Sequence, residues 1–274
     1  MGRPPCATCV RVWPSGRRRS VRPLAALISP PLLAAVLLSA CAPGSPAAAA
    51  HPETAIATDP PSATALPVST PVPTPLPLRV AVRAYHEPLD HAHRNYCGAG
   101  ATEVLLSAWM AGLPDVETVA RQIRLDPSSG ATGADTVAGI NAFLRPIVLP
   151  ALGGDRYRGA HVISVDGVLQ RLRADLGDAE AMRRFGHTVP VMVQTMTRTM
   201  PGWGGWQATH MITIAAASLD TGNPDVDTVT YAETPSPIAG YNGPPFQTIT
   251  VRALWTAMRA FLADDPADPV NVIS

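Results

Sequence analysis

The sequence contains no lysine, and all 21 of its basic residues are arginine. Together with the abundance of alanine and proline, this one-sided choice indicates a bias in nucleotide composition more than a function. Six of the arginines precede residue 41, whereas all 21 acidic residues follow it, so the later part of the chain carries about six net negative charges. No basic patch remains there, which argues against nucleic acid as a partner.

Cysteine is also scarce, with four residues in 274, and only Cys97 lies in the region that has a globular composition. Cys6 and Cys9 match the spacing C-x-x-C, but they stand alone in a segment that we expect to be removed. We therefore interpret that match as chance. Since the globular region has no second cysteine, a cysteine-rich metal site is disfavoured there.

Residues 1–41 have the features of an export signal: an arginine-rich start, an apolar run over 24–38, and then Leu38-Ser39-Ala40-Cys41. The sequence L-S-A-C resembles a bacterial lipobox. That resemblance implies lipidation of the Cys41 sulfur, cleavage before it, and an extracytoplasmic protein anchored by lipid to the cell membrane. The alternatives are an ordinary cleaved secretory signal and an uncleaved anchor, and Pro30-Pro31 disfavours the second.

Residues 42–77 contain ten prolines among alanine, serine and threonine, and almost no large apolar side chains. Such a segment cannot build a core and is typical of an extended, disordered tether. The chain therefore divides into a signal over 1–41, a tether over 42–77 and one folded domain over 78–274.

The periodicity of apolar residues predicts helices in the first half of this domain and strands in the second. A possible edge strand over 79–83 comes first. Helices are expected from Cys97 to Gly112, over 114–123, after the turn 128–133 and around 168–176. Short β-prone runs follow at 189–195, 210–217, 227–233 and 247–251, before a closing helix over 255–262. Helices first and strands afterwards predict the α+β class.

Cys97 stands at the start of the first expected helix, between Tyr96 and the glycines Gly98 and Gly100. Unpaired amide groups and the helix dipole favour an anion at such a position, and a thiolate is a nucleophile. The flanking glycines suit a tight entry where a substrate carbonyl approaches the backbone. The same pattern also fits a small apolar residue that fills a helix start.

A cysteine nucleophile requires a base, and His210 is the best placed of the seven histidines because it opens an apolar strand directly after a loop rich in glycine and tryptophan. Glu233, at the end of the next run, can orient that histidine if the two runs pair as a hairpin. Trp203 and Trp206 in the preceding loop are candidates for a cleft wall. The alternatives are that His210 is a strand-end histidine without a role, that Glu233 is a solvated acid, and that the two tryptophans only pack the loop onto the sheet.

These features resemble the papain-like cysteine peptidases of the bacteriocin-leader-processing type, in particular exported "peptidase thirty-nine-like" domains, over residues 79–263. The resemblance rests on Tyr96-Cys97-Gly98-Ala99 before a helix, Thr132-Gly133 before another, the strand 189–193, and His210 and Glu233 at strand ends. It implies a papain-like fold with Cys97 as nucleophile, His210 as base and acid, and Glu233 in place of the family's aspartate.

Three positions depart from the family pattern. Ala99-Gly100 replaces Pro-Ala after the nucleophile, and Glu233-Thr234-Pro235 replaces Asp-Pro, which lengthens the orienting side chain by one methylene. His91 stands six residues before Cys97, where the family has the glutamine that donates to the oxyanion. His91 is therefore the expected oxyanion donor, with the neighbouring Asn95 as the alternative.

The sequence thus predicts an extracytoplasmic cysteine peptidase or amide hydrolase without a cofactor, acting on a peptide or another amide. The alternative is a surface binding module that kept the fold and lost efficient catalysis. A metal site formed by His86, His91, His93 and Cys97 is a weaker third hypothesis. Processing of a leader within a transporter is not implied, because the chain contains no ATPase region or bundle of membrane spans.

Overall fold

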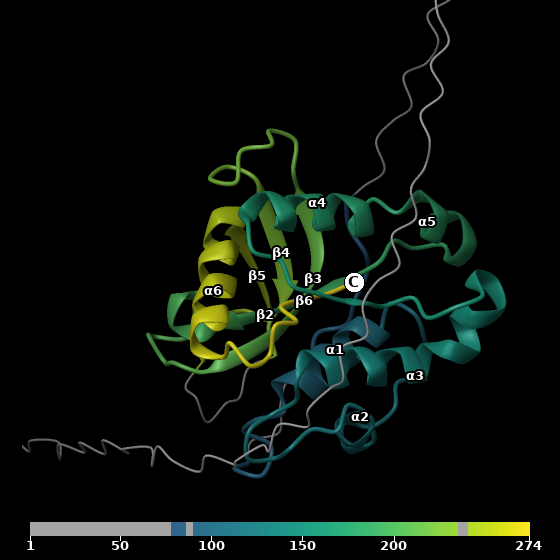
Figure 1. The fold of residues 1–274 in the computed structure, drawn as a ribbon, viewed down its shortest axis with the longest axis horizontal. Coiled ribbons are helices and arrows are strands. Elements are labelled where there is room, and N and C mark those ends of the chain that lie inside the picture. The colour runs from purple at the N-terminus through teal and green to yellow at the C-terminus, as the bar shows by residue number, and fades with distance from the viewer. Residues whose placement is uncertain (1–77, 86–89, 235–240) are drawn as a thin grey trace, which may run out of the picture. The chain divides into compact units, whose positions relative to one another are not determined.

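A computed structural model describes residues 78–85, 90–234 and 241–274, which all belong to one compact unit (Figure 1). The expected signal over 1–41 with Cys41, the expected tether over 42–77, and His86 lie outside the described residues. No helix within the described part has the length and apolar character to span a membrane.

The described chain is an α+β domain whose centre is a six-stranded antiparallel sheet, in the order β1-β6-β2-β3-β4-β5. The strands are β1 (Gly159–Ala160), β2 (Val191–Met196), β3 (Thr209–Ser218), β4 (Thr228–Ala232), β5 (Phe246–Thr250) and β6 (Val272–Ile273).

Six α-helices surround the sheet: α1 (Cys97–Leu106), α2 (Val116–Gln122), α3 (Gly133–Leu152), α4 (Val165–Leu176), α5 (Ala179–Phe185) and α6 (Val251–Asp264). Five of them begin at a side-chain cap that accepts a hydrogen bond from a first-turn amide. The caps of α2, α3, α4, α5 and α6 are Asp115, Thr132, Ser164, Asp178 and Thr250.

The two faces of the sheet carry separate apolar clusters, and the alternation of side chains along β2 and β3 divides them. Val191, Val193 and Ile212 belong to the cluster that includes α4 and α6. Met192 and Met211 belong to the cluster formed with α1 and α3. Because both faces are covered, every residue of β2 is buried. Figure 1 shows α1, α2 and α3 gathered together, with α6 on another side of the strands.

The predicted order of helices and strands is observed, and the hairpin between the runs at 210–217 and 227–233 is the antiparallel pair β3–β4. Two expectations were wrong. The first helix ends at Leu106, not Gly112. The expected edge strand over 79–83 contributes one isolated bridge, from Arg79 to Ala216 beside β3. The short helix α5 and the two-residue strands β1 and β6 were not expected, because such short elements give little periodicity to detect.

Candidate active site

Cys97 is the first residue of α1 and the free cysteine of the described chain. Its side chain is half-buried and lines a surface cavity between the helical part and the loop before β3. The first amide groups of a helix have no acceptor within that helix, so the amide of Cys97 is available beside its own sulfur. A thiol in this position is accessible and stands in a field that favours negative charge.

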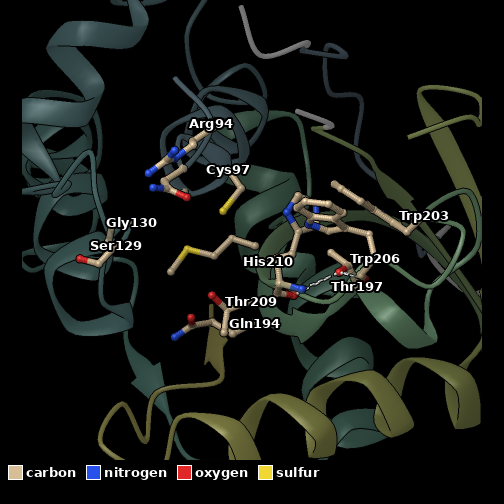
Figure 2. Close-up of a pocket in the computed structure, with 15 residues that line it drawn as sticks. Arg94, Cys97, Ser129, Gly130, Gln194, Thr197, Trp203, Trp206, Thr209 and His210 are labelled. Atoms are coloured by element: carbon tan, nitrogen blue, oxygen red, sulfur yellow. Dashed lines mark hydrogen bonds between the residues drawn. The ribbon is translucent and has the colours of Figure 1, made fainter. Parts of the chain in front are cut away.

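His210 enters the same cavity from the start of β3, where its ring is only 3% exposed. Pairing with Thr195 on β2 fixes its backbone, and the Thr195 hydroxyl donates to the His210 carbonyl at 3.0 Å. The ring atom Nε2 lies 2.5 Å from Glu233 Oε1. That contact leaves Nδ1 for the Cys97 thiol, whose interaction with the ring raises the pKa of His210. Figure 2 shows Cys97 and His210 on the wall of the same cavity.

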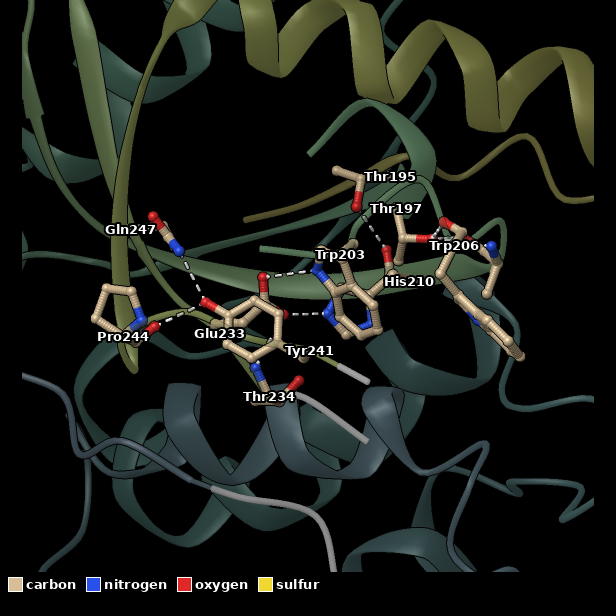
Figure 3. A network of polar contacts seen from close by, with 11 residues as sticks. Thr195, Thr197, Trp203, Trp206, His210, Glu233, Thr234, Tyr241, Pro244 and Gln247 are labelled. Carbon is tan, nitrogen blue, oxygen red and sulfur yellow. Dashed lines mark hydrogen bonds and ion pairs between the residues drawn. The ribbon is translucent and has the colours of Figure 1, made fainter. Parts of the chain in front are cut away.

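Glu233 directly follows β4 and is completely buried. Each carboxylate oxygen has a donor: Oε1 accepts from His210 and from the Thr234 amide at 3.1 Å, and Oε2 accepts from Trp203 Nε1 at 3.2 Å (Figure 3). A carboxylate without solvent needs such donors to remain charged. Since an ionised carboxylate only accepts, His210 Nε2 carries the proton and Nδ1 is free to receive one.

The pKa of His210 is raised above its ordinary value of 6.5. Burial is the largest single influence and opposes the charged ring. The negative charge of Glu233, together with hydrogen bonds from the ring to Cys97 and Glu233, outweighs that opposition. The environment therefore stabilises the imidazolium that forms when Nδ1 accepts a proton.

The two tryptophans named from the sequence have different environments. Trp203 is 4% exposed and packs edge-on against the His210 ring, with centroids 4.9 Å apart. It covers the His210–Glu233 pair and also contacts Tyr241. Trp206 is 51% exposed and forms part of the cavity wall. Trp203 thus shields the buried ion pair from water, whereas Trp206 is open to a ligand.

His91 is exposed and is not among the residues that line the cavity, so the structure does not bring it to Cys97. Asn95 does line the cavity, and its side-chain nitrogen donates to the Pro127 carbonyl at 2.7 Å. An amide nitrogen carries two hydrogens, so one remains for a ligand. Asn95 is therefore better placed than His91 to meet an oxyanion near Cys97.

His93 has both ring nitrogens occupied, by Asp90 Oδ1 at 2.7 Å and by Glu117 Oε1 at 2.6 Å. These carboxylates raise its pKa, with the Glu117 hydrogen bond as the largest cause. Within the described ranges, no group of three or more histidine, cysteine or acidic side chains is arranged to hold a metal. The convergence of His91, His93 and Cys97 that the metal hypothesis requires does not occur among the described residues.

Gly98 and Gly100 have separate roles. Gly98 lines the cavity, as expected for a close approach of substrate to backbone. Gly100 instead faces the ring of Tyr85, and a Cβ atom there would lie 2.7 Å from Tyr85 Cδ1 and 3.3 Å from Thr234 Cβ. The second glycine therefore permits close packing between α1 and the residues behind Glu233.

Sequence reasoning missed the side of the cavity that faces the two tryptophans. Arg94, Gln194 and the turn Ser129–Ala131 form part of it, as Figure 2 shows for those labelled there. The turn had been identified only as a connection between helices. Gln194 lies near the end of the buried run 189–195, and a long polar side chain in a buried strand was the signal that could have found it.

The arrangement places an accessible thiol, a buried imidazole and a buried carboxylate in line, beside free helix amides. Such a line can transfer a proton from sulfur to nitrogen and return it to a leaving group. No known protein family matches the chain, and the search of curated proteins found no relative.

Proposed function

We propose that residues 78–274 form an extracytoplasmic cysteine hydrolase of papain-like type that cleaves peptide or other amide bonds. The observation that carries this proposal is that Cys97 and His210 share one cavity and interact electrostatically, while Glu233 binds the His210 ring and Trp203 covers it. The resemblance to bacteriocin-leader-processing peptidases supports it, because that family uses a cysteine at a helix start and a histidine at a strand start. The lipid anchor at Cys41 is part of the proposal and lies outside the described residues.

In the proposed reaction, His210 Nδ1 takes the proton of Cys97, and the thiolate sulfur attacks the carbonyl carbon of the substrate. The negative charge that develops on the carbonyl oxygen is stabilised by the amide of Cys97 and the second side-chain hydrogen of Asn95. The imidazolium then gives its proton to the leaving nitrogen, and the C–N bond breaks to leave a thioester on Cys97.

Deacylation uses the same groups in the opposite direction. His210 takes a proton from water, the resulting hydroxide attacks the thioester carbonyl, and the sulfur leaves as the thiolate. An amine in place of water would complete acyl transfer by the same steps. Glu233 holds the ring in the required tautomer and stabilises its charged form throughout.

A burst experiment tests the proposal on the whole chain. With p-nitrophenyl acetate, we expect rapid release of one equivalent of nitrophenol per protein and an acetyl group on the Cys97 peptide in mass spectra. Cys97→Ala and His210→Ala should both abolish the burst. His161→Ala is the matched control, because His161 is an exposed histidine that binds the Pro269 carbonyl. A parent protein without acetylated Cys97 would contradict the proposal.

A binding module of the same fold is the second candidate, and the position of His91 favours it, because the expected oxyanion donor is exposed and outside the cavity. The burst separates the two functions. A binding module would acylate Cys97 no faster than a free thiol reacts, and His210→Ala would not change that rate.

A further inference from the structure

Gln194 is a buried polar residue on the wall of the cavity. It lies on β2, opposite Met211 and next to the pair formed by Thr195 and His210. Its side chain is 4% exposed, yet it lines the cavity that contains Cys97. Figure 2 shows it beside Thr209, across the cavity from Arg94. A glutamine in this position must either satisfy its polar atoms within the protein or present them to a ligand.

The amide nitrogen of Gln194 is fully used. It donates to Asp268 Oδ2 at 2.8 Å and to the Val270 carbonyl at 2.6 Å. Neither acceptor has a hydrogen to donate, so the two ends of the amide cannot be exchanged. Asp268 is itself held by the amide of Gly133 at the start of α3, at 2.6 Å. The orientation of Gln194 is therefore set by a chain of contacts behind the cavity wall.

The carbonyl oxygen Oε1 is the polar atom that remains. It has no hydrogen-bond partner among the described residues, and it is not one of the solvent-excluded side-chain oxygens that lack a partner. The oxygen is thus reached from the cavity. Because the nitrogen of the same amide donates to a buried carboxylate, polarisation makes Oε1 a stronger acceptor than the oxygen of a free amide.

The charge of the cavity wall indicates which kind of hydrogen-bond donor on a ligand can bind Gln194 Oε1. None of the residues that line the cavity is acidic, whereas Arg94 and His210 both belong to the lining. An ammonium group would find no carboxylate to pair with and would stand near two cationic side chains. A neutral N–H has no such penalty, and the backbone amide of a peptide is the common neutral donor.

We propose that Gln194 Oε1 accepts a hydrogen bond from a backbone N–H of the substrate, so that the site selects peptidyl chains over simple acyl groups. This inference rests on the proposed function, since it assumes that the substrate reacts with Cys97. Gln194 is a binding residue in this account and takes no part in proton transfer.

Peptidyl chloromethyl ketones test the inference on the whole chain, with alkylation of the Cys97 peptide followed by mass spectrometry. The set contains one capped tripeptide reagent and its analogues, each methylated at one backbone nitrogen. Every rate is divided by the iodoacetamide rate of the same protein. We expect methylation at one position to slow the relative rate about 10- to 100-fold, because it removes the donor.

Gln194→Met tests the same bond from the protein side, since methionine keeps the length of the side chain and lacks the acceptor oxygen. In this variant, the sensitive analogue and its parent reagent should react at rates within about twofold of each other. Gln170→Met, at an exposed position on α4, is the matched control and should preserve the full discrimination. The methylated series on the unaltered chain remains decisive if the Gln194 variant does not fold.

Two results would overturn the inference. One is that no methylated analogue is slowed in the unaltered chain. The other is that the slowing persists in Gln194→Met, which would mean that the methyl group acts by steric hindrance. Failure of the proposed function can be distinguished from failure of this inference by the reference reaction. If the proposed function is wrong, iodoacetamide will modify Cys97 no faster than it modifies a free thiol.

Discussion

Trp203 donates its indole N–H to Glu233 Oε2 at 3.2 Å, while the other oxygen of the same carboxylate binds the His210 ring. The indole therefore satisfies the second oxygen of a fully buried acid and at the same time covers the imidazole with its ring. Removal of either function should weaken the ion pair on which the proposed chemistry depends.

Trp203→Phe keeps an aromatic ring over His210 and removes the N–H donor. A hydrogen bond to a charged group contributes about 1.5–3 kcal/mol, so we expect the free energy of unfolding to fall by about that amount. Urea denaturation at pH 7 measures it. Trp206→Phe is the matched control, because Trp206 is half exposed, and its unfolding free energy should change by less than about 0.5 kcal/mol.

Glu233→Gln should change how stability depends on pH. Because the pKa of His210 is raised in the folded protein, the ion pair contributes its full stabilisation below pH 6.5, and this is lost as the pH rises through the raised pKa. The stability gap between the parent and Glu233→Gln should therefore be wide at pH 6 and narrow at alkaline pH. Urea denaturation at pH 6 and pH 9 measures both gaps, and a gap that widens with pH would contradict the assignment.

Asn95→Ala and His91→Ala separate the two candidates for the oxyanion donor. Asn95 lines the cavity and His91 does not, so only the first substitution should slow acylation of Cys97. Loss of one oxyanion donor lowers the rate about 100- to 1000-fold. The burst rate with p-nitrophenyl acetate measures both variants. A large loss in His91→Ala, with Asn95→Ala near the parent, would reverse the assignment.

Glu103→Gln should stabilise the domain above neutral pH. Burial in α1, followed by the charge of Asp115, raises the pKa of Glu103 to about 7. The unfolded chain releases this proton near 4.5, so ionisation of the folded state costs stability progressively from there up to about pH 7. With solvent screening allowed for, we expect a gain of about 1–2 kcal/mol at pH 8 and none at pH 4. Thermal unfolding at both pH values measures the gain.

Gly100→Ala should disturb the contact of Tyr85 with α1, because the new Cβ would lie 2.7 Å from the ring. Overpacking of this kind costs about 1–3 kcal/mol, partly offset by the higher helix propensity of alanine. Gly112→Ala is the control, since nothing lies within 4 Å of a Cβ at that position. Urea denaturation of both variants should show a loss only for Gly100→Ala.

The sequence was sufficient to predict the α+β class and the β3–β4 hairpin, because alternation and helical periodicity are local properties. The hairpin then brings His210 close to Glu233, since Thr213 on β3 pairs with Ala232 on β4. Because β3 and β4 are neighbouring strands of one hairpin, their register alone is enough to predict the contact between His210 and Glu233.

The positions of His91, Asn95 and Gln194 were not predictable in the same way. Asn95 and His91 are four residues apart in an irregular segment, where no periodicity specifies which side chain faces the cavity. The orientation of Gln194 depends on Asp268, which is 74 residues later in the chain. Contacts of that range depend on the assembled fold, so the local pattern shows a polar residue in a buried strand but not the direction of its side chain.

The pH dependence of Cys97 alkylation tests the central claim most directly. We expect iodoacetamide to modify the Cys97 peptide of the whole chain at pH 6 at least about tenfold faster than it modifies a free thiol, which is mostly protonated there. His210→Ala should remove that advantage, while His161→Ala should retain it. A parent rate at pH 6 equal to that of a free thiol, and unchanged in His210→Ala, would contradict the account.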